Sequence, residues 1–283
     1  MPPRPIPTAR RIRIGTELRR LRERAGMTAA EAARALGTTP GQLSNIESNR
    51  FGISADRVHA LAHIYDCTDQ ALVDALAAMA ADRTRGWWEE YRDTLPPRLL
   101  DLAELEHHAT ALRVTQVINI PGLLQTPEHA RALFRQAVPA LRPHQVEYRI
   151  SHRIKRQAIL HREQPPSYTA IVHEAALRMQ FGGREVTRAQ LRHLTEMSEH
   201  PAVTLRVIPF DGTSFPTTGH AVDYFHGPVP TLDTVEVDTA HGGTLVDAAG
   251  QLEKYRLVLD RMEAVALKPA ASRDLIHRIA QSI

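Results

Sequence analysis

Two short helical segments within residues 28–50, separated by a Gly-Thr-Thr break, constrain the fold of this chain more than any other stretch. Thr28 and Glu31 make the T-x-x-E pattern, in which a hydroxyl and a carboxylate satisfy free amides where a helix begins. The glycine of the break can end that helix. Thr39 followed by Pro40 begins the second helix, because a proline at the first helical position costs no hydrogen bond. This spacing predicts a helix-turn-helix.

The second helix of the pair would turn Leu43 and Ile46 inward and present hydroxyls and amides outward. Such groups can bond base edges in a major groove without repelling phosphate. We therefore predict a DNA-binding surface made of Thr39, Gln42, Ser44, Asn45, Asn49 and Arg50. Within it Gln42 and Asn45 are expected to choose the sequence, and Ser44 with the last two residues to contact phosphate. A small helical bundle without a DNA role is the alternative.

Glu47 is the exception on this helix, because a carboxylate near DNA is unfavourable unless it turns inward to meet a cation. Arg19 and Arg22, three residues apart on the preceding helix, are the candidate partners. The motifs L-R-R-L-R-E-R-A-G-M-T, A-L-G-T-T and I-E-S-N resemble the XRE-type (lambda and 434 repressor-like) helix-turn-helix family over about residues 14–66. In that family an arginine of the first helix pairs with the glutamate that ends the recognition helix. The resemblance thus implies a structural pair of Arg22 with Glu47.

The sequence departs from that family at Pro40 and Gly41, where members often place base-reading side chains, and at Ala29, often a glutamine that contacts phosphate. Base reading must then rely on the predicted surface itself. A single helix-turn-helix makes few base contacts, and a two-fold pair one helical turn apart multiplies them. We therefore expect a homodimer that binds double-stranded DNA at a short inverted repeat.

Positive charge is concentrated at the start of the chain. Residues 1–26 carry eight arginines against two acidic residues, although the net charge of the whole chain is only +3. We expect residues 1–11 to be a flexible basic arm, with the first helix beginning near Ile14. Basic side chains there release counterions when they meet phosphate. Contacts with the minor groove or the backbone are predicted for Arg10, Arg11 and Arg13; an ordinary solvated tail is the alternative.

With 283 residues and 43% apolar content, the chain can form two domains. We expect an all-α helix-turn-helix domain over residues 12–82, a junction over 83–98 and an α+β domain over 99–283. The junction contains Trp87, Trp88 and Tyr91, whose large apolar area suits packing, with base stacking as the alternative. Strands are predicted at residues 168–172, 203–208, 221–225 and 234–238. Helices are predicted at residues 99–113, 127–137, 143–163, 188–200, 250–267 and 272–281.

Motifs in the second half resemble a domain of unknown function that follows an XRE-type head in many actinobacterial regulators. They are IPGLLQT, R-x-x-R-Q, HEAALR, QLRHL and VTLRVIPF, and the resemblance runs from about residue 87 to 279. Such regulators are often encoded beside a small partner protein, and some are described as antitoxin-like. The resemblance therefore implies a small partner protein from an adjacent gene. The sequence departs from it where His220, His226 and His241 occur, and a ligand preference could reside there.

Catalytic motifs are missing from the sequence. There is no G-x-S-x-G elbow, no G-x-x-x-x-G-K-[ST] loop and no G-x-G-x-x-G after a strand. We expect no catalytic residue, no cofactor and no metal site. Two alternatives stay open: a small-molecule sensor with a pocket between sheet and helices, and a hydrolase. The hydrolase would use His173, Glu174, His220 and Asp223 as acid and base.

Cysteine and hydropathy patterns bear on the compartment. Cys67 is the single cysteine, which excludes an internal disulfide. The first residues lack the apolar run of a secretory signal, and no segment approaches the length of a membrane span. We expect a cytoplasmic protein that associates with the nucleoid when it binds DNA.

Overall fold

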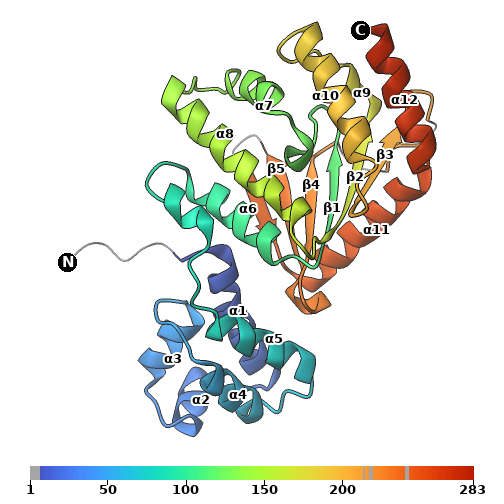
Figure 1. The fold of residues 1–283 in the computed structure, drawn as a ribbon. Helices are drawn as coiled ribbons and strands as arrows, with labels where there is room; N and C mark the ends of the chain where they lie inside the picture. Colours follow the sequence, from blue (N-terminus) through green and yellow to red (C-terminus); the bar gives the residue numbers. More distant parts are fainter. Residues whose placement is uncertain (1–6, 213, 217–218, 240–241) are drawn as a thin grey trace. The chain divides into compact units, whose positions relative to one another are not determined.

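The computed structural model describes residues 7–212, 214–216, 219–239 and 242–283. Contacts divide the chain into two compact units. The head unit contains the chain up to Arg92 together with Pro96–Leu105 and Pro228–Leu232. The sheet unit contains Asp93–Leu95, Glu106–Gly227 and Asp233–Ile283. An all-α helix-turn-helix region is thus followed by an α+β region, as the sequence predicts (Figure 1).

Helices make up the head unit (Figure 1). Their bounds are Ala9–Arg24 for α1, Ala29–Ala35 for α2, Pro40–Glu47 for α3, Ala55–Ile64 for α4 and Gln70–Ala81 for α5, followed by a 3₁₀ turn η1 at Trp87–Tyr91. The helix α6, Pro97–His108, begins in this unit. Buried leucines join α1, α3, α4 and α5 in one core, and they include Leu18, Leu43, Leu61 and Leu76.

Local capping explains most helix starts in the head unit. Thr28 forms the expected capping box with Glu31, and the hydroxyl of Thr39 accepts an amide hydrogen bond at the start of α3. Helix α1 begins before the expected Ile14, and the amide of Ala9 donates to Asp101 Oδ1 at 2.8 Å. This bond satisfies a free amide at the helix start from α6, 92 residues away. The sequence around α1 therefore contains no signal for this early start of the helix.

A six-stranded sheet forms the centre of the sheet unit, in the order β3-β2-β1-β4-β5-β6. Strands β1, β2 and β3 are parallel, whereas β4 pairs antiparallel with β1 and β5, and β5 with β6. The bounds from β1 to β6 are Ala111–Gln116, Ser167–His173, Val203–Ile208, Val222–His226, Thr234–Thr239 and Gly242–Val246. Four of these strands, β2 to β5, lie where the sequence predicts them.

Strands β1 and β6 were not predicted. The helix expected over residues 99–113 ends at His108, and β1 follows as the strand that joins the parallel and antiparallel parts of the sheet. Leu112 and Val114 are buried there. Two alternating apolar positions are too few to distinguish a strand from the last turn of an amphipathic helix. Pairing with β2 and β4 supplies the missing information.

Helices lie on both sides of the sheet (Figure 1). They are α7 (Pro127–Phe134), α8 (Pro143–Gln157), α9 (Glu174–Arg178), α10 (Arg184–Met197), α11 (Ala249–Val265) and α12 (Pro269–Ser282), with 3₁₀ turns at Gly122–Leu124 and Ala158–His161. A further 3₁₀ turn, Pro230–Leu232, belongs to the head unit. Leu252 and Leu259 of α11 pack on Val222 and Val235 of the sheet. Among the described residues, no helix has the length and apolarity needed to cross a membrane.

Side-chain amides from two helices hold the I-P-G-L-L-Q-T stretch. Gln157 of α8 donates to the carbonyls of Gly122 and Gln125 at 3.2 and 2.6 Å. Gln190 of α10 donates to Leu124 O and accepts from the amide of Thr126, both at 2.7 Å. Buried backbone groups are costly unless they are bonded, and these glutamines supply the partners. The motif that carries the second resemblance thus has a structural role.

Candidate nucleic-acid interface

Helix α3 is short, and its two faces differ in chemistry. Leu43 and Ile46 are buried in the core of the head unit. The hydroxyl of Thr38 donates to the side-chain oxygen of Gln42. With its side-chain oxygen bonded to Thr38, Gln42 presents its amide nitrogen as a donor. The predicted DNA-binding residues form the opposite, polar face, where Thr39, Gln42, Ser44 and Arg50 are exposed and Asn45 and Asn49 are half-buried.

Asn49 has a backbone role that the sequence did not reveal. Its φ of 54° lies in the left-handed region, where asparagine is one of the few tolerated residues. The amide of Asn49 bonds Ile46 O at 2.9 Å, and the amide of Arg50 bonds Asn45 O at 2.7 Å. Asn49 therefore ends α3.

Arg22 and Glu47 form a two-pronged ion pair between α1 and α3. Arg22 Nε lies 2.7 Å from Glu47 Oε1, and Nη2 lies 2.9 Å from Oε2. Arg22 also donates to Met27 O at 2.8 Å. Both side chains are largely buried, and the hydrogen bond with Glu47 raises the pKa of Arg22. The other candidate, Arg19, pairs with Glu23 at 2.7 Å on the exposed side of α1.

Gly15 brings α1 into backbone contact with the end of α3. A Cβ at this position would lie 2.6 Å from Glu47 O and 2.7 Å from Ile46 O, closer than real Cβ atoms approach. The two helices can meet here only because the residue is glycine. The sequence signal for this contact is a glycine inside a helical pattern, which does not by itself identify the partner.

The three arginines near the start of the chain that were predicted to reach DNA lie inside α1. Arg13 is buried; its Nε bonds Glu17 at 2.7 Å and its Nη2 donates to Thr231 O at 2.6 Å. The predicted role is therefore wrong for Arg13, whose guanidinium is held in the interior by these contacts. Arg10 is half-buried with its pKa lowered by burial, and Arg11 is exposed. Residues 1–6 of the expected arm lie outside the described residues.

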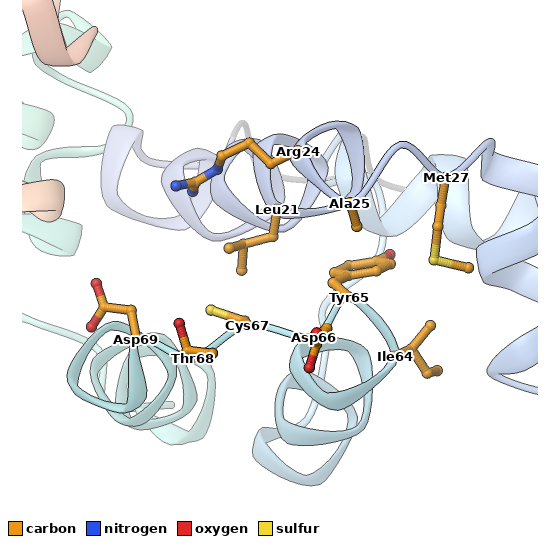
Figure 2. Close-up of a pocket in the computed structure, with 10 residues that line it drawn as sticks. All are labelled: Leu21, Arg24, Ala25, Met27, Ile64, Tyr65, Asp66, Cys67, Thr68 and Asp69. Carbon is orange, nitrogen blue, oxygen red and sulfur yellow. The ribbon is translucent and has the colours of Figure 1, made fainter.

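A pocket of about 490 Å³ opens on the head unit between the end of α1 and the turn that joins α4 to α5 (Figure 2). Leu21 and Ala25 line one side, and Cys67 and Thr68 line the other. The ring of Tyr65 also lines it, and burial raises the pKa of this tyrosine to about 12. None of the residues predicted to contact DNA lines this pocket.

The residues of the hydrolase alternative are not brought together. His173 Nδ1 accepts from the amide of Ala175 at 3.1 Å, and Glu174 accepts from the amide of Phe210 at 2.9 Å. Asp223 is on β4, which β1 separates from the β2 strand that ends at His173. By the pairing register, His173 and Asp223 also point to opposite faces of the sheet. The fourth residue, His220, is exposed.

The histidines at the departure from the family pattern do not form one site among the described residues. His226 Nδ1 lies 3.4 Å from Asp233 at the end of β4, whereas His220 precedes that strand. His241 lies outside the described residues. Within the described part of the chain, no group of three or more histidine, cysteine or acidic side chains could hold a metal ion.

Carboxylates gather on one face of the sheet, and this cluster was not predicted from the sequence. Asp223 of β4 and Glu236 of β5 are register partners, so their side chains share a face. Glu106 of α6 forms a buried ion pair with Arg156 of α8, with Nε 2.7 Å from Oε2. Burial, together with the charges of Glu236 and Glu106, raises the pKa of Asp223 to about 8. Asp223 Oδ1 is enclosed and has no hydrogen-bond partner among the described residues.

Comparison with known families agrees with the two-part organisation. A family model described as a helix-turn-helix domain matches residues 13–76. A second model, described as a domain of unknown function (DUF5753), matches residues 99–278, which is more than half of the chain. No curated protein and no solved structure matches the chain. The chain therefore carries a helix-turn-helix domain and belongs to the DUF5753 family.

Proposed function

We propose that this protein is a sequence-specific, DNA-binding transcriptional regulator of the XRE type that reads a major groove with α3. The observation that carries the proposal is the polar face of α3, which presents amides and hydroxyls while its one carboxylate, Glu47, is turned inward to Arg22. Neutral donors and acceptors can match base edges at no cost in phosphate repulsion. The family match to a helix-turn-helix domain supports the same function.

In this proposal Gln42 and Asn45 read bases, each good contact being worth about 1–3 kcal/mol. Ser44, Asn49 and Arg50 position the helix on phosphate. From α1 we retain the exposed Arg11 for phosphate contact, and Arg10 contributes only if its contact with Asp82 opens. Arg13 has no DNA role here.

Two copies of the chain would bind one short inverted repeat. Helix α3 has eight residues, so a single copy reaches few base pairs. A two-fold arrangement doubles these contacts and places the recognition helices about 34 Å apart, one turn of the duplex. The protein would act in the cytoplasm and associate with the nucleoid through this interface.

We assign signal reception to the sheet unit, with a small protein from an adjacent gene as its partner, in the manner of an antitoxin-like component of an actinobacterial regulator pair. The support is the family resemblance. The alternative is control by a small molecule that binds the sheet unit. No catalytic step is assigned, because His173 and Glu174 bond backbone amides.

The test is selection of duplexes from a random library by the full chain, followed by binding measurements across a range of salt concentrations. We expect an enriched palindrome and an affinity that falls with salt. The variant Gln42→Ala with Asn45→Ala should lose the preference for the palindrome. A matched control, His59→Ala with His63→Ala on exposed positions of α4, should keep it. Failure of the full chain to enrich any sequence would refute DNA reading.

The partner is tested separately. Co-expression with the product of the adjacent gene should give a complex that co-elutes in size-exclusion chromatography and changes the affinity for the selected duplex. A palindrome whose affinity responds to no neighbouring protein would favour the small-molecule alternative.

A further inference from the structure

One segment of the head unit comes from the connection between two strands of the sheet. Residues Pro228–Leu232 connect β4 to β5, yet their contacts assign them to the head unit. Leu232 is buried in the core of the head unit, and Val229 packs against the same core. The core around the helix-turn-helix therefore includes a residue that lies far outside residues 12–82.

Arg13 is the side chain of α1 that binds this segment by a hydrogen bond. Its Nη2 donates to Thr231 O at 2.6 Å, and its Nε bonds Glu17 at 2.7 Å. Glu17 also accepts from Arg20 at 2.6 Å and is almost completely buried. A buried charge needs fixed partners, and the carbonyl of Thr231 is one of them. The arginine that the sequence suggested for DNA instead holds the connection between β4 and β5.

The two ends of the same connection, Gly227 and Asp233, form its base and are held together by hydrogen bonds within the sheet unit. Asp233, the next residue, accepts from Tyr224 OH at 2.7 Å and from the amide of Gly227 at 2.9 Å. His226 Nδ1 lies 3.4 Å from the same carboxylate. The bond between Gly227 and Asp233 closes the two ends of the connection against each other. A loop this short has few conformations once its ends are joined. A displacement of Gly227 or Asp233 at the base should therefore also displace the tip, residues 228–232.

Helix α1 links this segment to the recognition helix. Thr231 contacts α1 at Arg13, and two residues further Gly15 meets the backbone of Glu47 at the end of α3. Arg22, on the same helix, holds the Glu47 side chain. Helix α1 is continuous over 16 residues, and a helix that moved as one rigid element would pass a shift at Arg13 to α3.

Resting on the DNA-reading function proposed above, we propose that residues 228–232 are a positioning element of the head unit, through which a change at the β4–β5 base alters the placement of α3. A partner or ligand that moved β4 or β5 would act on DNA binding by this route. Coupling of this kind is reciprocal, so DNA bound at α3 should also restrain the connection.

The experiment uses the full chain and hydrogen exchange read by mass spectrometry. The loop variant Val229→Ser with Leu232→Ser removes the buried contacts. We expect exchange in α1 and α3 to accelerate by about tenfold or more, as loss of buried leucine and valine packing opens the unit locally. Strands β2 and β3 should exchange as before. The matched control, Leu257→Ser with Val265→Ser at exposed positions of α11, should leave α1 and α3 unchanged.

A second variant guards against a head unit that simply unfolds. Asp233→Asn leaves the residues of the tip intact and weakens the base. A faster exchange of α1 and α3 with this variant would support coupling, because the substitution lies outside the head unit. If exchange of α1 and α3 accelerated in the loop variant alone, the segment would serve only to fill the core, and the proposal would be overturned. Unchanged exchange in both variants would also overturn it.

Binding to the duplex selected by the wild-type chain separates this inference from the proposed function. We expect the loop variant to bind that duplex at least about tenfold more weakly, which corresponds to about 1.4 kcal/mol. If the wild-type chain selected no duplex, the proposed function would fail, while the exchange data would still decide whether the segment positions α3.

Discussion

Gly15 of α1 lies so close to Glu47 of α3 that a Cβ at Gly15 would be 2.6 Å from the Glu47 carbonyl oxygen. The atom it would meet belongs to the backbone, which cannot swing aside as a flexible side chain can. Because Glu47 ends the helix that we propose reads DNA, this contact sets how deeply α3 is seated against α1.

Gly15→Ala should therefore destabilise the head unit, although alanine favours helices. Overpacking of a tight contact costs about 1–3 kcal/mol, which exceeds the helical preference of alanine over glycine. Thermal unfolding followed by circular dichroism measures the change. Gly41→Ala is the matched control, because a Cβ at that position of α3 meets nothing within 4 Å and should stabilise the unit. Equal effects of the two substitutions would contradict the close approach.

Arg22→Ala should lower the stability of the head unit by about 3–5 kcal/mol, because it leaves the largely buried Glu47 without its cation. Chemical unfolding is the measurement. Arg19→Ala, which breaks an exposed pair with Glu23, should leave stability almost unchanged, because solvent and salt screen exposed ion pairs. An Arg22→Ala protein of unchanged stability that bound DNA weakly would show that the arginine acts on DNA and not on the fold.

Asn45→Ala should reduce discrimination between the selected palindrome and a scrambled duplex by about 1–3 kcal/mol, while weak, salt-sensitive binding persists. The half-buried Asn45 is in the middle of the polar face of α3. Competition binding at two salt concentrations gives both quantities. Retention of full discrimination would move base reading away from this position.

Asp223 should make the sheet unit less stable as pH rises. Its ordinary pKa of 3.8 is raised to about 8 by burial and by neighbouring carboxylates, so the folded state keeps a proton that the unfolded state has lost. The stability linked to this proton is complete below about pH 4 and is lost as pH rises through 8. Asp223→Asn should therefore raise the melting temperature more at pH 8 than at pH 5. Asp274→Asn, at an exposed position of α12, serves as the control.

His129 should have the opposite pH dependence. Burial, with a smaller effect of Arg153, lowers its pKa from 6.5 to about 4, so the folded state excludes a proton that the unfolded state accepts. The linked stability is present above about pH 6.5 and is lost as pH falls through 4. His129→Leu should flatten the dependence of melting temperature on pH between these values. If the melting temperature of that variant fell with acid as much as that of the wild-type chain, the titrating group would be a residue other than His129.

The sequence by itself determined the local features of this protein. Thr28 with Glu31 and Thr39 with Pro40 set helix starts through bonds that span three residues, so the helix-turn-helix was predictable from adjacent side chains. Strands β2 to β5 were predictable for a similar reason, because runs of β-branched and aromatic residues favour extended backbone. The outward polar face of α3 followed from helical spacing alone.

Only the tertiary structure decided features that depend on which distant segments meet. The bond from Ala9 to Asp101, the bond from Arg13 to Thr231 and the pairing of β1 with β2 and β4 all join separate elements. Local propensity is worth a fraction of a kcal/mol per residue, about 0–0.7 kcal/mol, and burial of side chains against a partner outweighs it. Arg13 shows the consequence. Its charge in the sequence suggested a contact with DNA, whereas in the fold it is buried and donates a hydrogen bond to the carbonyl of Thr231.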